Sequence, residues 1–153
     1  GMYNRMGYQQ LGEESFRISG LNKRKLLILF VDLDRLKYIN DTFRHEYGDM
    51  AICAAARALM QCSSRDAVPA RTGGDEFVLI QSYQSDEVSR ELVLRIRRTL
   101  EAEGKAQKLP FPLSMSIGTV VTDPESALSF ADYVKIADSR MYEEKVQKRA
   151  ARK

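Results

Sequence analysis

A chain of 153 residues, 44% of them hydrophobic, has the size of one domain with a substantial buried core. The formal net charge is only +3, and no basic stripe interleaved with aromatic residues appears, so composition does not favour nucleic acid as a partner. No signal peptide or membrane-spanning stretch is visible, and Cys53 and Cys62 are too far apart along one predicted helix to bridge. We therefore expect a domain in the cytoplasm, without a membrane contact of its own.

Hydrophobic periodicity and capping residues predict an alternation of helices and strands. In chain order we expect a helix at Arg5–Ser19, a strand at Lys25–Leu33, a helix at Leu36–Glu46, a helix capped by Asp49 and running to about Cys62, strands at Val68–Arg71 and Phe77–Gln81, a helix at Glu87–Glu103 capped by Asp86 and ended by Gly104, a strand at Leu113–Val121 and a helix within Leu128–Lys148. A hairpin in the middle of this order predicts an α+β fold, a ferredoxin-like antiparallel sheet flanked by helices.

The connection between the two hairpin strands carries two glycines followed by two acids. Gly73 and Gly74 predict a tight turn, because glycine accepts the positive φ angles of such turns. Asp75 and Glu76 then begin an apolar strand, where two like charges repel unless a cation lies between them. Mg²⁺ is the natural candidate because it prefers carboxylate oxygens.

A second acidic site ends the predicted strand at Lys25–Leu33. This apolar run has the length of a buried strand, and it ends in Asp32, Leu33 and Asp34. Facing the hairpin acids, these aspartates would complete a carboxylate cluster for one or two Mg²⁺ ions over the phosphates of a nucleotide. The plainer alternatives are a strand-end cap for Asp32 and a polar hairpin tip for Asp75 and Glu76.

Taken together, these segments resemble the GGDEF domain of the diguanylate cyclase family over nearly the whole chain. The matching segments are Tyr3-Asn4-Arg5, Asp32 to Asp41 against the family pattern D-x-D-x-F-K-x-I-N-D, His45 with Gly48-Asp49, Gly73-Gly74-Asp75-Glu76-Phe77, Ser116-Ile117-Gly118, and Ala137-Asp138 through Tyr142 and Lys145. The resemblance implies a core related to nucleotidyl cyclases and polymerase palms. It also implies condensation of two GTP molecules into cyclic di-GMP with release of two pyrophosphates.

The resemblance assigns the reactive end of the nucleotide to the acids and glycines. It implies that Asp32, the backbone carbonyl of Leu33 and Asp75 bind Mg²⁺, with Mn²⁺ as a second option. Glu76 would orient or help deprotonate the ribose 3′-hydroxyl. Gly73 and Gly74 would let the backbone approach the nucleotide, where a β-carbon would collide with it.

The remaining assignments concern the base and the phosphates. Asn40 and Asp49 match the family's guanine-reading residues, and a carboxylate is a suitable acceptor for the N1–H and N2–H₂ groups of guanine. A helix cap is the alternative role for each. Lys37, Lys145 and Arg149 match cations that lie near the triphosphate, and the last two share one helix face at a spacing of four.

The chain departs from the family pattern at four places. Leu36 replaces a phenylalanine, and Arg44 replaces a glycine, where a positive φ would strain it by about 1 kcal/mol. The usual G-R-N near the end reads Lys148-Arg149-Ala150. The R-x-x-D motif of the family's product-inhibition site is absent, since Ser63 stands three residues before Asp66.

The resemblance also implies a partner. One site binds one GTP, so two GGDEF domains must face each other in a transient homodimer. We expect residues 1–153 to form a single GGDEF domain of a larger signalling protein. A catalytically silent GGDEF domain, acting as a GTP-binding or protein-interaction module, is the alternative reading.

Overall fold

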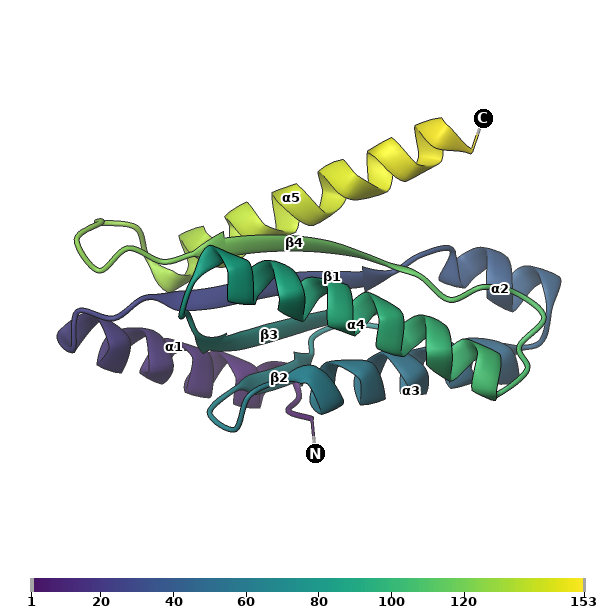
Figure 1. Cartoon of the computed structure of the whole chain (residues 1–153), viewed down its shortest axis with the longest axis horizontal. Coiled ribbons are helices and arrows are strands. Elements are labelled where there is room, and N and C mark those ends of the chain that lie inside the picture. The colour runs from purple at the N-terminus through teal and green to yellow at the C-terminus, as the bar shows by residue number, and fades with distance from the viewer. Residues whose placement is uncertain (1, 153) are drawn as a thin grey trace.

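The computed structural model describes residues 2–152, which form five helices and one four-stranded sheet (Figure 1). The elements are α1 (Arg5–Leu21), β1 (Leu26–Leu33), α2 (Leu36–Thr42), α3 (His45–Cys62), β2 (Val68–Arg71), β3 (Glu76–Ser82), α4 (Asp86–Ala106), β4 (Met115–Val121) and α5 (Phe130–Ala151). The strands pair antiparallel in the order β2-β3-β1-β4. The predicted α+β class is confirmed.

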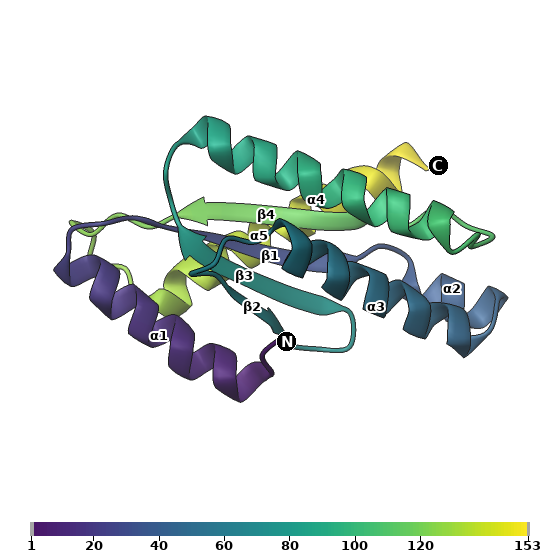
Figure 2. The same cartoon turned by 60° about the horizontal axis from the view of Figure 1, so that its bottom comes forward.

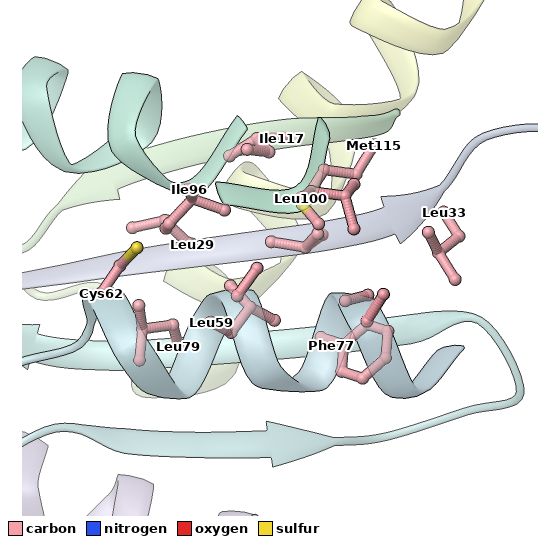
Figure 3. Packing of buried hydrophobic residues seen from close by; sticks show 14 of the residues in the cluster. Leu29, Leu33, Leu59, Cys62, Phe77, Leu79, Ile96, Leu100, Met115 and Ile117 are labelled. Atoms are coloured by element: carbon pink, nitrogen blue, oxygen red, sulfur yellow. The ribbon is translucent and has the colours of Figure 1, made fainter. Parts of the chain in front are cut away.

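The central strand β1 is buried along its whole length and divides the core into two layers. Because side chains alternate across a strand, Leu27, Leu29 and Val31 share one face of β1 and belong to one cluster. Figure 3 shows Leu29 of this cluster with Leu59 of α3 and Ile96 and Leu100 of α4. Figure 2 shows α3 and α4 over one face of the sheet, with α5 behind the other.

The second layer lies between the sheet and the helices α1 and α5. Ile28 and Phe30 of β1 pack there with Tyr8 of α1 and Phe130 and Met141 of α5. The same alternation turns Asp32 to the α5 side, and Asp34, directly after β1, also contacts α5 through Lys148. The face of the sheet on which any site at this strand end forms is thereby fixed.

Helix α5 lies directly against β4 at Gly118. A β-carbon at this position would overlap the carbonyl oxygen of Ala137, which belongs to the backbone of α5. Since backbone atoms cannot rotate away as a flexible side chain can, only glycine allows this approach. The glycine of the Ser116-Ile117-Gly118 segment therefore sets the distance between α5 and the sheet.

Several predicted boundaries differ from those observed. Helix α3 begins at His45, so Asp49 lies inside it and is not its cap. Ser85, not Asp86, caps α4, because the Ser85 hydroxyl accepts the Val88 amide at 3.1 Å. Helix α4 continues through Gly104, which packs against Leu113.

Both ends of the chain show similar shifts. Helix α1 continues through Gly20 to Leu21, and α5 begins at Phe130 because Ser129 and Asp132 form a reciprocal capping box. In residues 2–152, no helix combines the length and the apolar character needed to cross a membrane.

The close approach at Gly118 predicts a large effect of a single methyl group. Gly118→Ala should lower the free energy of unfolding by at least about 3 kcal/mol, because the backbone of α5 must move. Gly20→Ala is the matched control, since a β-carbon at Gly20 meets nothing within 4 Å and should raise stability by up to about 1 kcal/mol. Urea denaturation of both variants measures the difference, and equal stabilities would contradict this packing.

Candidate active site

The predicted acidic residues come together at one end of the sheet. Asp32 and Glu76 are direct partners in the β1–β3 register, and the Leu33 amide donates to the Asp75 carbonyl at 3.1 Å. The hairpin loop before Glu76 therefore lies beside the last residues of β1. The predicted meeting of the two acidic segments is confirmed in the structure's geometry.

Lys145 of α5 forms an ion pair with one oxygen of the buried Asp32. Its Nζ lies 2.9 Å from Asp32 Oδ2, and the side chains are only 15% and 12% exposed. Asp32 Oδ1 is buried and has no hydrogen-bond partner among residues 2–152. Burial first, and then the neighbouring Asp75 carboxyl, raises the pKa of Asp32 to about 7 against the lowering effect of Lys145.

These residues fit a divalent cation only with help from other oxygens. An unpartnered buried carboxylate oxygen beside a second carboxyl group is the donor chemistry that Mg²⁺ takes. Within residues 2–152, no group of three His, Cys, Asp or Glu side chains could hold a metal by itself. A metal here would complete its shell with water, backbone or phosphate oxygens, which is the usual habit of Mg²⁺ at nucleotide sites.

The glycine loop differs from the expected tight turn. Four residues, 72–75, join β2 to β3, and the Thr72 amide closes the loop on the Glu76 carbonyl at 3.0 Å. Neither glycine has a positive φ, so the prediction of that conformation is wrong. A loop of this length reverses the chain without left-handed residues.

The two glycines have different surroundings. A β-carbon at Gly73 would lie 3.1 Å from the Glu76 carboxylate, whereas one at Gly74 would meet open space. Arg71 donates to both glycine carbonyls, with its closest contact at 2.7 Å to Gly74. The guanidinium thus turns these carbonyls to one side of the loop.

Glu76 also borders a cleft between α1 and α5. This cleft has a volume of about 260 Å³, with Phe30, Val78 and Phe130 among the lining residues and Arg5 at its edge. A larger groove of about 510 Å³, lined mainly by α4 and β4, contains none of the predicted site residues.

The two predicted guanine-reading residues lie on neighbouring helices. Asn40 is half-buried in α2, and a β-carbon at Gly48 of α3 would overlap its Oδ1. Asp49 follows Gly48 and is exposed. Neither residue occupies a cap position, so the helix-cap alternative is wrong for both.

Comparison with known proteins identifies this arrangement. The family described as "Diguanylate cyclase, GGDEF domain" matches residues 1–151. The chain belongs to the GGDEF family. Its fold is the palm-like cyclase fold of these domains.

Named relatives agree with this assignment. The chain is 30% identical over 145 residues to "Probable diguanylate cyclase DgcC" of Escherichia coli K12, covering 95% of this chain and 39% of that protein. It is 32% identical over 130 residues to "Diguanylate cyclase A" of Treponema denticola, covering 83% of this chain and 34% of that protein. The chain therefore spans well under half the length of these relatives.

A solved structure matches closely in fold. The GGDEF domain of DgcB from Caulobacter crescentus, in complex with c-di-GMP, superposes with a TM-score of 0.85 at 21% identity. The match covers 95% of this chain and 86% of that one.

Two of the predicted phosphate-binding cations form no ion pair with the site carboxylates among the described residues. Lys37 of α2 and Arg149 of α5 are exposed, and their part in phosphate binding stays a prediction, as does the metal contact of the Leu33 carbonyl. Only Lys145, among the three predicted phosphate-binding cations, has an ion pair with a site carboxylate in the described residues.

The structure shows the surroundings of two positions at which the chain departs from the family pattern. Arg44 has φ −109° and ψ 156°, which is extended backbone, so the strain expected for it is absent. Asp66, where the inhibitory motif is missing, accepts hydrogen bonds from the Ser64 and Ser82 hydroxyls, and these bonds lower its pKa.

Asp34, which the sequence analysis places in the carboxylate cluster, instead lies in a hydrogen-bond network with two serines and a lysine that the sequence analysis did not predict. Asp34 accepts from Lys148 Nζ at 2.6 Å, Ser116 Oγ at 2.6 Å and Ser114 Oγ at 2.7 Å. Burial acts to raise the pKa of Asp34, but these three donors lower it overall. Its spacing of two residues from Asp32 was the available signal, since both aspartates contact lysines of α5.

The raised pKa of Asp32 predicts an unusual pH dependence of stability. Because the folded state holds this proton more tightly than the unfolded state, the contribution of Asp32 to stability is complete below about pH 3.8 and is lost as the pH rises to and through about 7. Relative to Asp32→Asn, the parent chain should lose up to about 4 kcal/mol between pH 4 and pH 8.

Chemical denaturation across this pH range measures the loss, with Glu143→Gln on the exposed side of α5 as the control. Asp34 and Asp66 have lowered pKa values, so their contributions change only at more acidic pH. Parallel stability curves for the parent chain and Asp32→Asn would contradict this account.

Proposed function

We propose that this GGDEF domain is a diguanylate cyclase that condenses two GTP molecules into cyclic di-GMP and releases two pyrophosphates. The observation that carries the proposal is the convergence of Asp32, Asp75, Glu76 and Lys145 at one end of the sheet. Relatives named as diguanylate cyclases and a fold match in complex with c-di-GMP support the same reading.

The reaction needs positioning and charge neutralisation more than covalent chemistry by the protein. In each half-reaction a ribose 3′-hydroxyl attacks an α-phosphate, and pyrophosphate leaves. Negative charge on the phosphates must be balanced beside carboxylates that are themselves negative. A cation between these groups resolves this conflict.

Asp32 and Asp75 would hold Mg²⁺, which supplies charge neutralisation at the phosphates when bound. The unpartnered Oδ1 of Asp32 is the atom best suited to this contact. Lys145 already approaches the other oxygen, so it lies within reach of anionic groups at the same place. Lys37 and Arg149 would add positive charge around the triphosphate from α2 and α5.

Glu76 is the proposed residue nearest the nucleophile. It stands opposite Asp32 in the strand register and its carboxylate lies against Gly73. From there it would accept a hydrogen bond from the 3′-hydroxyl and orient it for attack. Gly74, with open space where a β-carbon would stand, would let the nucleotide lie close to the loop.

The product has two-fold symmetry, whereas each domain supplies one set of these residues. Two domains must therefore face each other, each bringing one GTP. Proximity in the pair would convert a bimolecular step into an effectively unimolecular one. A transient homodimer is accordingly the proposed working form.

Removing Asp75 should separate catalysis from folding. Asp75→Ala should reduce cyclic di-GMP formation from GTP and Mg²⁺ by at least about 100-fold, because it removes a proposed metal ligand. Its thermal stability should be unchanged or higher, because like-charge repulsion with Asp32 is relieved. Chromatographic identification of the product measures activity.

Glu101→Ala, on the exposed surface of α4, is the control for loss of one acid. Retained turnover in Asp75→Ala would exclude the proposed metal site. If the parent chain binds GTP but forms no product under any protein concentration, the silent-module alternative holds instead.

Guanine selection is tested by binding. GTP should bind more tightly than ATP by about 2–4 kcal/mol if Asn40 and Asp49 both contact the base, since adenine lacks the N1–H and N2–H₂ donors. Asn40→Ala should weaken GTP binding and reduce this preference, while Gln107→Ala serves as an amide control at the end of α4. Equal affinities for GTP and ATP by calorimetry would refute the assignment.

A further inference from the structure

The second ion pair between α5 and β1 is not used by the proposed reaction. Lys148 Nζ lies 2.6 Å from Asp34 Oδ2, 2.8 Å from the Met115 carbonyl and 3.2 Å from Glu144 Oε1. The ammonium group donates hydrogen bonds to Asp34 and to the Met115 carbonyl, and Glu144 contacts it as a longer ion pair. The lysine side chain is 31% exposed and that of Asp34 only 5% exposed.

The pair belongs to a charge network that joins four elements. Arg97 of α4 bonds to Glu144 of α5 at 2.8 Å and also donates to the Met115 carbonyl at the start of β4. Glu144 also forms an ion pair with Lys148, and Lys148 forms one with Asp34, directly after β1. Two helices on opposite faces of the sheet are therefore fastened to the same strand ends.

This network lies one helical turn from the proposed phosphate-binding lysine. Lys145 and Lys148 are three residues apart, so they share a face of α5, and their partners Asp32 and Asp34 lie at the end of β1 and directly after it. The helix thus contacts the strand through two parallel ion pairs. Displacing the outer pair would let the last turns of α5 move away and carry Lys145 with them.

We propose that Lys148 is a positioning residue, which through Asp34 fastens the C-terminal turns of α5 to β1 and so holds Lys145 at the site. The inference rests on the proposed function in assigning GTP as the ligand of Lys145. Its structural half, the fastening of α5, stands on the contacts alone. Lys148 acts through Asp34 and does not itself bind the nucleotide.

The contacts of both partners favour this role over direct phosphate binding. Each oxygen of Asp34 already receives a hydrogen bond from a serine, and Lys148 supplies the only charge-compensating group at Asp34 among the described residues. Removing one partner of a buried pair leaves an uncompensated charge, which is strongly unfavourable. Lys148 is therefore held where it is by Asp34, whether or not nucleotide is bound.

The first measurement follows amide hydrogen exchange in α5 without nucleotide. Lys148→Met should speed exchange of the amides in Arg140–Ala151 by at least about threefold, because the helix end opens locally more often. Lys148→Arg should restore protection, since a guanidinium can also bond to Asp34. Lys135→Met, an exposed lysine of the same helix, is the control and should leave exchange unchanged.

The second measurement is GTP affinity by calorimetry in the presence of Mg²⁺. Lys148→Met should weaken binding by about five- to tenfold, and Lys148→Arg should stay within about twofold of the parent chain. Asp34→Asn should weaken binding similarly, and the double variant should be no weaker than either single one. Such non-additivity is the signature of residues that act as a unit.

The outcomes separate the inference from the proposed function. Unchanged exchange in Lys148→Met, or GTP affinity equal to that of Lys135→Met, would overturn the positioning role. The positioning role would also be overturned if the loss of GTP affinity in the double variant equalled the product of the two single losses, since Lys148 would then contact the nucleotide itself. If the parent chain binds no GTP, the proposed function fails, and the exchange measurement still decides whether Lys148 fastens α5.

Discussion

Two carboxylates at the buried end of a central strand are the constraint on which the rest of this structure depends. Moving an ionised aspartate out of water is costly unless a partner compensates the charge. Counted as whole residues, Asp32 and Asp34 are each only 8% exposed, and both contact lysines of the same layer. A helix that brings positive charge to that layer is therefore required, and α5 meets the requirement with Lys145 and Lys148.

The two aspartates are compensated to different degrees, and this difference distinguishes their roles. Each oxygen of Asp34 accepts from a serine and one also accepts from Lys148, and its pKa is lowered. Asp32 has a lysine on one oxygen only, and burial beside Asp75 raises its pKa. An incompletely compensated carboxylate is typical of a functional site, and a fully hydrogen-bonded neighbour is typical of the structure that supports such a site.

Much of this site can be predicted from the sequence, because short-range hydrophobic periodicity locates the strands that bear its acidic residues. The apolar run ending in Asp32 predicts a buried strand, and the acids after Gly74 predict a second acidic segment. Their meeting also depends on antiparallel pairing of β1 with β3, two strands that are not consecutive in the chain. Resemblance to a known family then supplies roles that spacing alone could not supply.

Other features could not be predicted, since they depend on tertiary distances. The turn at Gly73 and Gly74 was expected to use positive φ, but the loop contains four residues and is closed by Thr72 and Glu76. Helix starts were misplaced at Asp49 and Asp86, because an acidic residue in the first turns resembles a cap. The Lys148–Asp34 pair joins residues 114 positions apart, and no local pattern specifies that distance.

The position of α5 is fixed by two kinds of contact: a backbone contact sets its distance from the sheet, and ion pairs set its angle. Gly118 brings the middle of α5 against β4 at backbone distance, which fixes the separation of the helix from the sheet but leaves its end free to swing. The ion pairs of Lys145 and Lys148 lie nearer the C-terminus of α5, beyond Met141, the last α5 residue in the buried apolar cluster. Close-packed apolar contacts resist separation of the two layers, whereas directed ion pairs select one angle among those that packing allows. The acidic end of the sheet thus holds in place the same helix that makes its burial possible.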